Sequence, residues 1–160
     1  MKPDILERAF LVGVSGKSDS ARRHFQDSMD ELELLAGTVN VQVINSYVQT
    51  LDKPNTKTYI GSGKLKEIKQ HLNESQVETL IFNDNLTPSQ AKNITTVTHC
   101  NVVDRTELIL AIFALHARTN ASKLQVELAQ LEYNYSKLRN LWQHLSRIEG
   151  GIGMRGPGEK

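Results

Sequence analysis

The sequence predicts an α/β domain with a small, mostly parallel sheet, followed by a long helical arm. Strand-like apolar runs alternate with single helical patterns up to residue 104, and this order requires crossover connections that leave the strands parallel. Beyond that point the pattern is helical, and half of the ten glycines fall within the last eleven residues. We therefore expect an α/β subdomain over 1–104, a helical arm over 105–149 and a glycine-rich tip loop over 150–160.

The first expected elements are a strand and a helix. The apolar run 9–14 is typical of a buried strand. N-cap candidates at 18–20 precede apolar side chains that recur three or four residues apart, which predicts a helix. Gly37 directly follows the last of these, Ala36, and stands where a C′ glycine ends a helix.

Two strand-like segments follow. In the segment 39–48, side chains alternate between faces, so Val41, Val43 and Asn45 are expected on one face. The segment 58–60 predicts a shorter strand.

Further helices and strands complete the predicted subdomain. Ser62 is placed to cap a helix that carries Leu65, Ile68 and Leu72 on its apolar face. The segment 77–82 is strand-like, and 87–90 (TPSQ) is a capping box with proline at the first helical position. Residues 101–103 predict a last short strand.

The expected arm begins at another capping box, which Asp104 and Glu107 frame. The run 108–115 is apolar all round, so we expect it to be buried. The polar segment 118–122 predicts a kink or a short break. Beyond it, apolar side chains recur at spacings of four and three, which is a heptad pattern. We call these residues the seam: Leu124, Leu128, Leu131, Tyr135, Leu138, Trp142 and Leu145.

The seam has two interpretations. A helix that covers the sheet of its own domain would show a wider apolar face than this narrow stripe. The seam therefore favours a helical hairpin or an intermolecular partner over packing on its own sheet.

Composition limits the protein class. Hydrophobic residues make up 39% and charged residues 23% of the 160, as in soluble globular proteins. A single cysteine, Cys100, excludes an internal disulfide framework and suits a reducing, cytoplasmic location, and no run is long enough to span a membrane. Residues 1–115 hold 12 basic and 14 acidic residues, whereas 116–160 hold 7 and 4, so a polyanion would prefer the carboxy-terminal third.

No sequence motif establishes a nucleotide or metal site. The turn 14–18 lies between a strand and a helix, but a phosphate loop needs a glycine five positions before Gly16, where Leu11 stands. The turn 59–64 matches neither nucleotide fingerprint, so a tight turn or an anion contact both fit it. The five histidines are scattered, which predicts no metal site.

Four runs of residues resemble the HflX family of ribosome-associated GTPases, and the resemblance covers essentially the whole chain. The runs are 59–64 (YIGSGK), 104–110 (DRTELIL), 124–131 (LQVELAQL) and 144–159 (HLSRIEGGIGMRGPGE).

The resemblance implies a stress-linked GTPase that binds the large ribosomal subunit and splits or rescues stalled ribosomes. It implies an α/β subdomain and a long helical hairpin whose tip loop reaches toward the peptidyl-transferase centre. Because the chain ends at Lys160, the returning helix and the GTP-binding domain are expected outside it. GTP and Mg²⁺ are therefore expected for the whole family protein, and no cofactor, catalytic residue or metal ligand for this chain.

The resemblance also implies contacts. The expected partners are the large ribosomal subunit and its RNA, the GTPase domain of the same protein and, through the seam, a second copy of the chain. Arginine suits RNA because its planar guanidinium donates to phosphate and stacks on bases. The expected ribosome- and RNA-binding residues are Arg118, Lys123, His144, Arg147, Gly151, Gly153, Arg155, Gly156 and Gly158.

Two alternatives remain open. The chain is an ATP-handling domain that uses the glycine turns near Gly16 and Gly61, or a module whose seam binds a protein helix without RNA.

The residues 115–117 (LHA) stand where related sequences often carry a more basic pair, which weakens RNA contact at that point.

Overall fold

The computed structural model describes residues 7–148, with side chains described from 7 to 135. Strands and helices alternate through the first hundred residues, and two helices follow. In chain order the elements are β1 Glu7–Ser15, α1 Asp19–Thr38, β2 Val41–Thr50, α2 Ser62–Ser75, β3 Thr79–Phe82, α3 Pro88–Thr98, β4 Asn101–Val103, α4 Arg105–His116 and α5 Asn120–Ile148.

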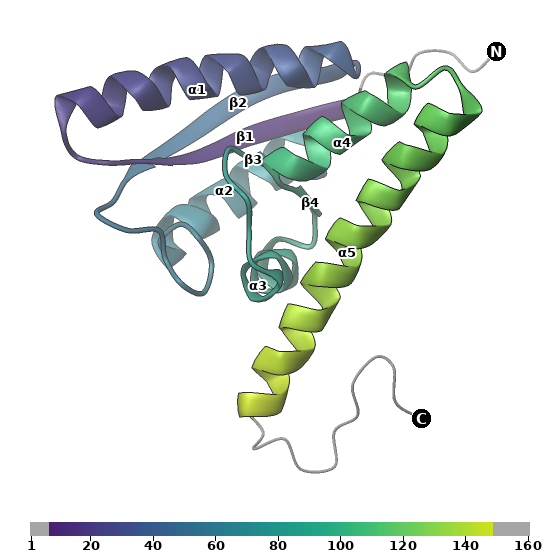
Figure 1. Cartoon of the computed structure of the whole chain (residues 1–160). Helices are drawn as coiled ribbons and strands as arrows, with labels where there is room; N and C mark the ends of the chain where they lie inside the picture. Colours follow the sequence, from purple (N-terminus) through teal and green to yellow (C-terminus); the bar gives the residue numbers. More distant parts are fainter. Residues whose placement is uncertain (1–6, 149–160) are drawn as a thin grey trace.

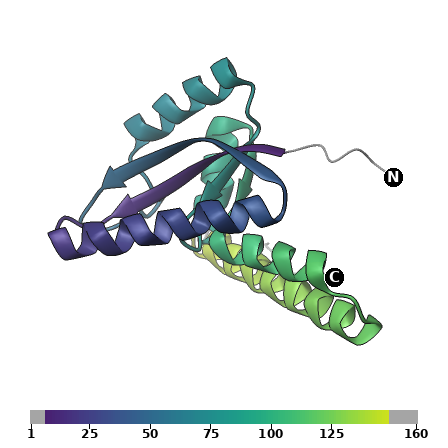
Figure 2. The same cartoon turned by 90° about the horizontal axis from the view of Figure 1, so that it is seen from above.

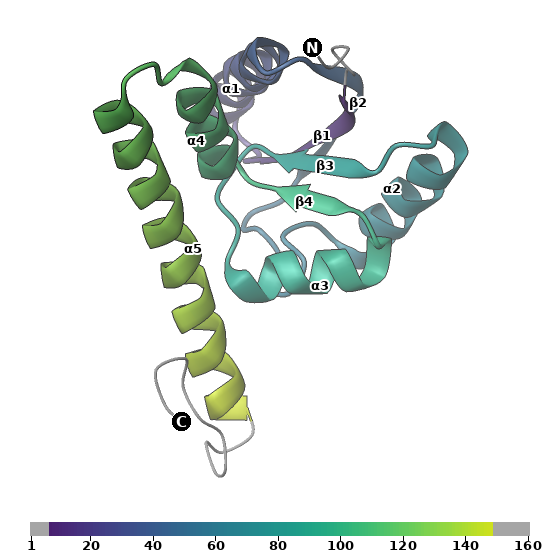
Figure 3. The ribbon, with the colours of Figure 1, turned by 90° about the vertical axis from the view of Figure 1, so that its right-hand side faces the viewer.

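The sheet has four strands in the order β2-β1-β3-β4, and every pairing is parallel. The chain therefore crosses the sheet after each strand, as the alternating pattern predicts. Helices α1 and α4 lie on one face of the sheet, and α2 and α3 lie on the other (Figures 1 and 3). The predicted α/β class with a parallel sheet is confirmed.

The core consists of two clusters, one on each face of the sheet. In β1, Phe10 and Val12 face the cluster under α2 and α3, whereas Ala9 and Leu11 face the cluster under α1 and α4. All four side chains are buried, which explains why β1 reads as a continuous apolar run. The view from above shows α1 and α4 on the same side of β1 (Figure 2).

Helix starts follow the sequence signals closely. The side chain of Ser18 accepts a hydrogen bond from the amide of Ala21 at the start of α1. Both predicted capping boxes, Thr87 with Gln90 and Asp104 with Glu107, are present. Because each box satisfies two amides that a helix start leaves without partners, these residues fix where α3 and α4 begin.

Two predictions about turns are wrong. Helix α1 does not end at Gly37 but continues to Thr38, and the left-handed residue after it is Asn40, with φ 61°. Asparagine tolerates this conformation better than most residues do. The segment 58–60 is not a strand, because Tyr59 pairs back with Asn55 in a single antiparallel bridge that closes a tight turn.

Two further corrections concern β2 and α2. The register of β2 against β1 shifts between Ala9 and Phe10, whose partners are Val43 and Asn45, so one extra residue forms a bulge. Past the bulge the faces exchange, so Asn45 does not share the face of Val43 and instead hydrogen-bonds Tyr47 on the opposite face. At α2 the N-cap is Gly61 rather than the predicted Ser62.

The prediction that 108–115 is buried is wrong for most of that run. Leu108 is 3% exposed and joins the core, whereas Phe113 and Leu115 are 55% and 59% exposed. Ile112 still packs partly against the core, but the other side chains of the distal half lie away from the sheet. The polar segment breaks the helix, since α4 ends at His116 and α5 begins at Asn120. Within residues 7–148, no helix combines the length and apolar character that a membrane span needs.

Candidate binding surface on the helical hairpin

Helices α4 and α5 form an antiparallel hairpin at one side of the sheet (Figures 1 and 2). The turn between them is fixed by Thr119 and Ser122. The amide of Ser122 donates to the hydroxyl of Thr119 (3.0 Å), and the amide of Thr119 donates to the hydroxyl of Ser122 (3.1 Å). These reciprocal bonds start α5 in the way that a capping box does.

Most of the seam is directed away from α4, although Leu131 also lines a cleft with Glu107 and Leu110 of α4. Leu124, Leu128, Leu131 and Tyr135 are 63%, 56%, 64% and 60% exposed. The side chains that α5 turns inward are Val126, Ala129 and Tyr133, which are half-buried. Residues two positions apart on a helix point in nearly opposite directions, so packing on α4 leaves the seam uncovered.

The side chains of Leu138, Trp142 and Leu145 lie outside the described residues. The seam's role in partner binding stays a prediction.

A mainly apolar cleft of about 420 Å³ lies where the two helices diverge. Its walls come from both helices near the turn, and its residues are Leu110, Phe113, His116, Ala117, Ser122, Gln125, Val126 and Ala129. The hairpin therefore exposes apolar side chains in two places, the cleft and the seam.

The structure separates the expected RNA-binding residues into two groups. Arg118 and Lys123 are exposed at the turn that begins α5. Arg147 belongs to the other end of α5, about 36 Å from Lys123 at 1.5 Å per residue. The side chains of His144 and Arg147 are outside the described range, as are all of Gly151, Gly153, Arg155, Gly156 and Gly158. The positions of Lys123 and Arg147 on α5 are therefore too far apart to belong to one compact RNA site.

A polar junction links the hairpin to the α/β layer. We call it the joint, and it consists of Asp104, Arg105, Thr106 and Tyr133. Asp104, at the end of β4, is completely buried. One carboxylate oxygen accepts from the amide of Glu107 (3.0 Å), and the other accepts from the amide of Leu86 (3.2 Å) and the hydroxyl of Tyr133 (2.6 Å). This carboxylate thus holds α4, the loop before α3, and α5 at one point.

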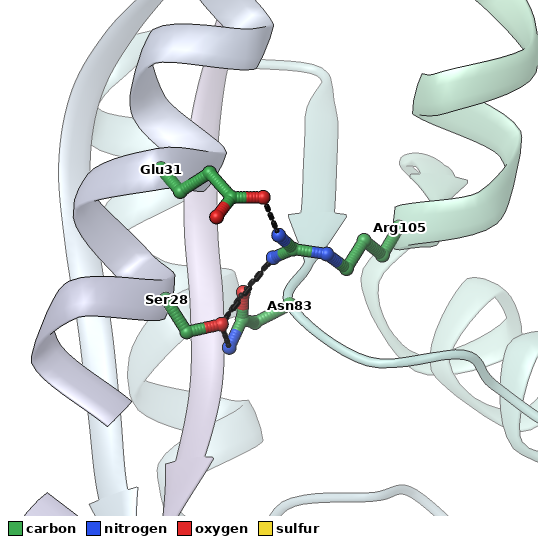
Figure 4. A network of polar contacts seen from close by, with 4 residues as sticks. All are labelled: Ser28, Glu31, Asn83 and Arg105. Carbon is green, nitrogen blue, oxygen red and sulfur yellow. Dashed lines mark hydrogen bonds and ion pairs between the residues drawn. The ribbon is translucent and has the colours of Figure 1, made fainter. Parts of the chain in front are cut away.

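Arg105 and Thr106 connect the joint to α1 and to the residues that follow β3. The guanidinium of Arg105 donates to Asn83 (2.7 Å) and forms an ion pair with Glu31 of α1, while Ser28 bridges to Asn83 (Figure 4). The hydroxyl of Thr106 donates to the side chain of Asn85 (2.7 Å).

Sequence reasoning identified Asp104 only as a helix cap and missed the rest of the joint. Because the carboxyl ends of β3 and β4 meet at one edge of a parallel sheet, polar residues that follow both strands were the available signal.

The two glycine turns lie at the carboxyl edge of the sheet, and both are occupied by contacts within the chain. Lys17 pairs with Asp52 at 3.2 Å, and both side chains are well exposed. The amide of Gly61, at the start of α2, donates to the side chain of Gln49 (2.8 Å). The amide of Gly61 is therefore engaged by β2, and Gly61, the N-cap of α2, supplies no side-chain cap.

Tyr59, the first residue of the second turn, is buried at this edge of the sheet. Its ring packs edge-on against Phe82, and its hydroxyl donates to Asp84. Burial, followed by the contact with Asp84, raises the pKa of Tyr59, so the hydroxyl stays protonated and remains a donor. Among the described residues, no group of three or more His, Cys, Asp or Glu side chains is arranged to hold a metal ion.

Comparison with known proteins places this architecture in a class of GTP-binding proteins. Residues 26–114 match the sequence model of the family described as GTP-binding GTPase N-terminal, and 116–160 match that of GTP-binding GTPase Middle Region. A crystal structure of a GTP-binding protein from the hyperthermophilic archaeon Sulfolobus solfataricus in complex with GDP superposes with a TM-score of 0.62. It shares 32% identity, over 89% of this chain and 40% of that one.

Curated relatives narrow the class. GTPase HflX of Flavobacterium psychrophilum is 44% identical over 96% of this chain, and GTPase HflX of Escherichia coli is 38% identical over 98%. The chain belongs to the HflX GTPase family and corresponds to its amino-terminal region. It spans 37% and 36% of the length of these two relatives.

Proposed function

We propose that this chain is the ribosome-binding amino-terminal region of an HflX-type GTPase that splits or rescues cytoplasmic ribosomes, and that it is non-catalytic by itself. The large subunit and its RNA are the proposed partners. GTP and Mg²⁺ belong to the GTPase domain of the whole protein, which is a further proposed partner of the hairpin.

The observation that carries the proposal is the shape of the arm. Helix α5 runs past α3 and extends beyond the α/β layer (Figures 1 and 3). A rigid helix of 29 residues, about 43 Å long, can carry a short segment away from the domain that anchors it. The residues after α5 include five glycines and Arg155, a composition that suits close approach of backbone and guanidinium to folded RNA.

Charge supports the same assignment. Residues 116–160 contain 7 basic and 4 acidic residues, in contrast to the acidic balance of the preceding part. Arg118 and Lys123, exposed at the hairpin turn, supply a second basic point on the arm. An RNA surface that contacts both Lys123 and Arg147 would have to follow most of the length of α5.

Co-sedimentation of the chain with purified large ribosomal subunits tests the proposal. We expect weak binding that falls as salt rises, because phosphate contacts release counterions. Replacing Arg155 by Ala should reduce the pelleted fraction, and deleting 150–160 should reduce it further. Arg23→Ala is the matched control, because Arg23 is an exposed arginine on α1, away from the arm.

Equal pelleting of the intact and deleted chains at one salt concentration would contradict the tip-loop assignment. Equal losses for Arg23→Ala and Arg155→Ala would mean that general charge, rather than the arm, causes binding.

A second candidate function is a helix-mediated protein interaction, which the exposed seam favours. In that case Leu131→Glu abolishes partner binding while RNA has no effect on it. ATP handling has no comparable support, because Gln49 and Asp52 already engage the two glycine turns.

A further inference from the structure

We propose that Asp104, Arg105 and Tyr133 are positioning residues that set the direction of α5 relative to the α/β layer. The inference deepens the proposed function, because the direction of α5 decides where the segment beyond it is delivered. It rests on the proposed function only in that last step, since the mechanical claim concerns the free chain.

The first support is how α5 is held. Helix α5 packs against α4 and contacts α3 as well, and the hydroxyl of Tyr133 bonds to Asp104. Packing against α4 fixes α5 to a helix rather than to the sheet. The bond to Asp104 connects α5 to the end of β4 and to the loop before α3, which belong to the rigid layer.

The second support is that α4 itself is anchored by the same residues. Asp104 caps α4, and Arg105, in its first turn, reaches α1 through Glu31 and the end of β3 through Asn83. Figure 4 shows the guanidinium between these two elements. Beyond Leu108, Ile112 packs only partly against the core, and Phe113 and Leu115 are more than half exposed, so the direction of α4 depends mainly on this first turn and on Leu108.

The third support is leverage. From Tyr133 to Ile148, α5 rises about 22 Å at 1.5 Å per residue. A tilt of about 10° at Tyr133 therefore moves the end of α5 by about 4 Å. A displacement of that size is longer than a hydrogen bond. A small change of tilt at the joint is therefore enough to break a contact made at the end of α5.

Pulsed electron paramagnetic resonance on the full chain measures this freedom. Spin labels go on Lys66→Cys in α2 and Asn140→Cys in the distal half of α5, and single-label samples account for any reaction of the buried Cys100. Tyr133→Phe keeps the ring and removes the hydroxyl. Tyr135→Phe is the matched control, because Tyr135 is 60% exposed on the same helix.

We expect Tyr133→Phe to broaden the label-to-label distance distribution at least about twofold while leaving the helical circular dichroism unchanged. Arg105→Lys should broaden it in the same direction, because an ammonium group cannot hold Glu31 and Asn83 in one planar fork. Distributions equal in width to those of the intact chain and of Tyr135→Phe, in both folded variants, would overturn the proposal.

The ribosome experiment separates this inference from the proposed function. Tyr133→Phe should reduce pelleting with large subunits about two- to fivefold, although it removes no charge. If the intact chain does not pellet at all, the proposed function fails while the distance distributions still decide the role of the joint. If Tyr133→Phe broadens the distribution and pelleting is unchanged, the joint orients α5 and delivery of the tip does not depend on it.

Discussion

The joint and the seam are both side-chain clusters that involve α5, but they differ in solvent exposure. In the joint, Asp104 is fully buried and each of its carboxylate oxygens accepts hydrogen bonds. Along the seam, four large apolar side chains are each more than half exposed. Polar groups are thus buried where the chain meets itself, and apolar groups are exposed where it does not.

The different burial of the joint and the seam indicates which of the two the α/β layer needs for its own stability. Burying a carboxylate costs free energy unless the carboxylate is well hydrogen-bonded. The hydrogen bonds of Asp104 in the joint are therefore needed for the stability of the fold. Exposed leucines contribute little to that stability, so the fold itself does not account for the seam. Substitutions in the two regions should therefore change different measured quantities.

The largest expected contrast is between two leucines. Leu108→Ala, in the core cluster under α1, should lower the free energy of unfolding by about 2–5 kcal/mol because it leaves a cavity. Leu131→Ala, at 64% exposure, should lower it by about 0.5 kcal/mol or less. Urea unfolding followed by circular dichroism measures both, at protein concentrations low enough to keep the chain monomeric. Similar losses would mean that the seam packs on its own domain.

The next contrast concerns two aspartates. Asp104→Ala removes the cap of α4 and leaves the buried amide of Leu86 without its acceptor, which together should cost about 2–4 kcal/mol. Asp52→Ala, in an exposed ion pair, should change stability by about 0.5 kcal/mol or less. The same unfolding experiment compares them, and equal effects would remove the joint from the account of stability.

Self-association tests the seam directly. Burying one leucine side chain is worth about 1.5–3 kcal/mol, so chains at tens of micromolar should associate through the seam. Leu131→Glu should raise the dissociation constant at least about tenfold in sedimentation velocity. Glu132→Leu, at the neighbouring position off the seam, serves as the control and should not weaken association. A monomeric intact chain would contradict this use of the seam.

The smallest effect is expected for arginine. Arg105→Lys keeps the charge and loses the planar fork between Glu31 and Asn83, so stability should fall by about 0.5–1.5 kcal/mol. Arg22→Lys, at an exposed position of α1, should have no measurable effect. A loss confined to low ionic strength would indicate that the ion pair with Glu31, rather than the bond to Asn83, matters, because salt screens ion pairs.

Local signals in the sequence predicted much of the fold. Capping boxes at Thr87 and Asp104 fixed two helix starts because their hydrogen bonds involve residues only three apart. The same local reasoning failed at Asn45 and at Tyr59, where a bulge and a tight turn depend on a neighbouring strand and on contacts with Asp84 and Phe82. It also overestimated the burial of the distal half of α4, because an apolar run does not reveal where the sheet ends.

The candidate surface was only partly predictable. Heptad spacing identified the seam, since residues on one face of a helix follow from periodicity alone. Family resemblance, rather than any local pattern, supplied the RNA-binding assignment of residues such as Arg155. The joint was missed because Asp104 and Tyr133 are 29 positions apart in sequence and Arg105 and Glu31 are 74 apart. Such contacts follow from the topology of the sheet, which single-sequence patterns give only in outline.

Cys100 offers a consequence of a different kind. Its thiol is buried between α3 and β4 and hydrogen-bonds with Thr98, and burial raises its pKa. A disulfide reagent can therefore react only when this edge of the sheet opens, since the thiolate and access to it are both needed. The reaction rate of Cys100 therefore measures local opening of the sheet edge at the start of β4, the strand whose other end leads into the joint.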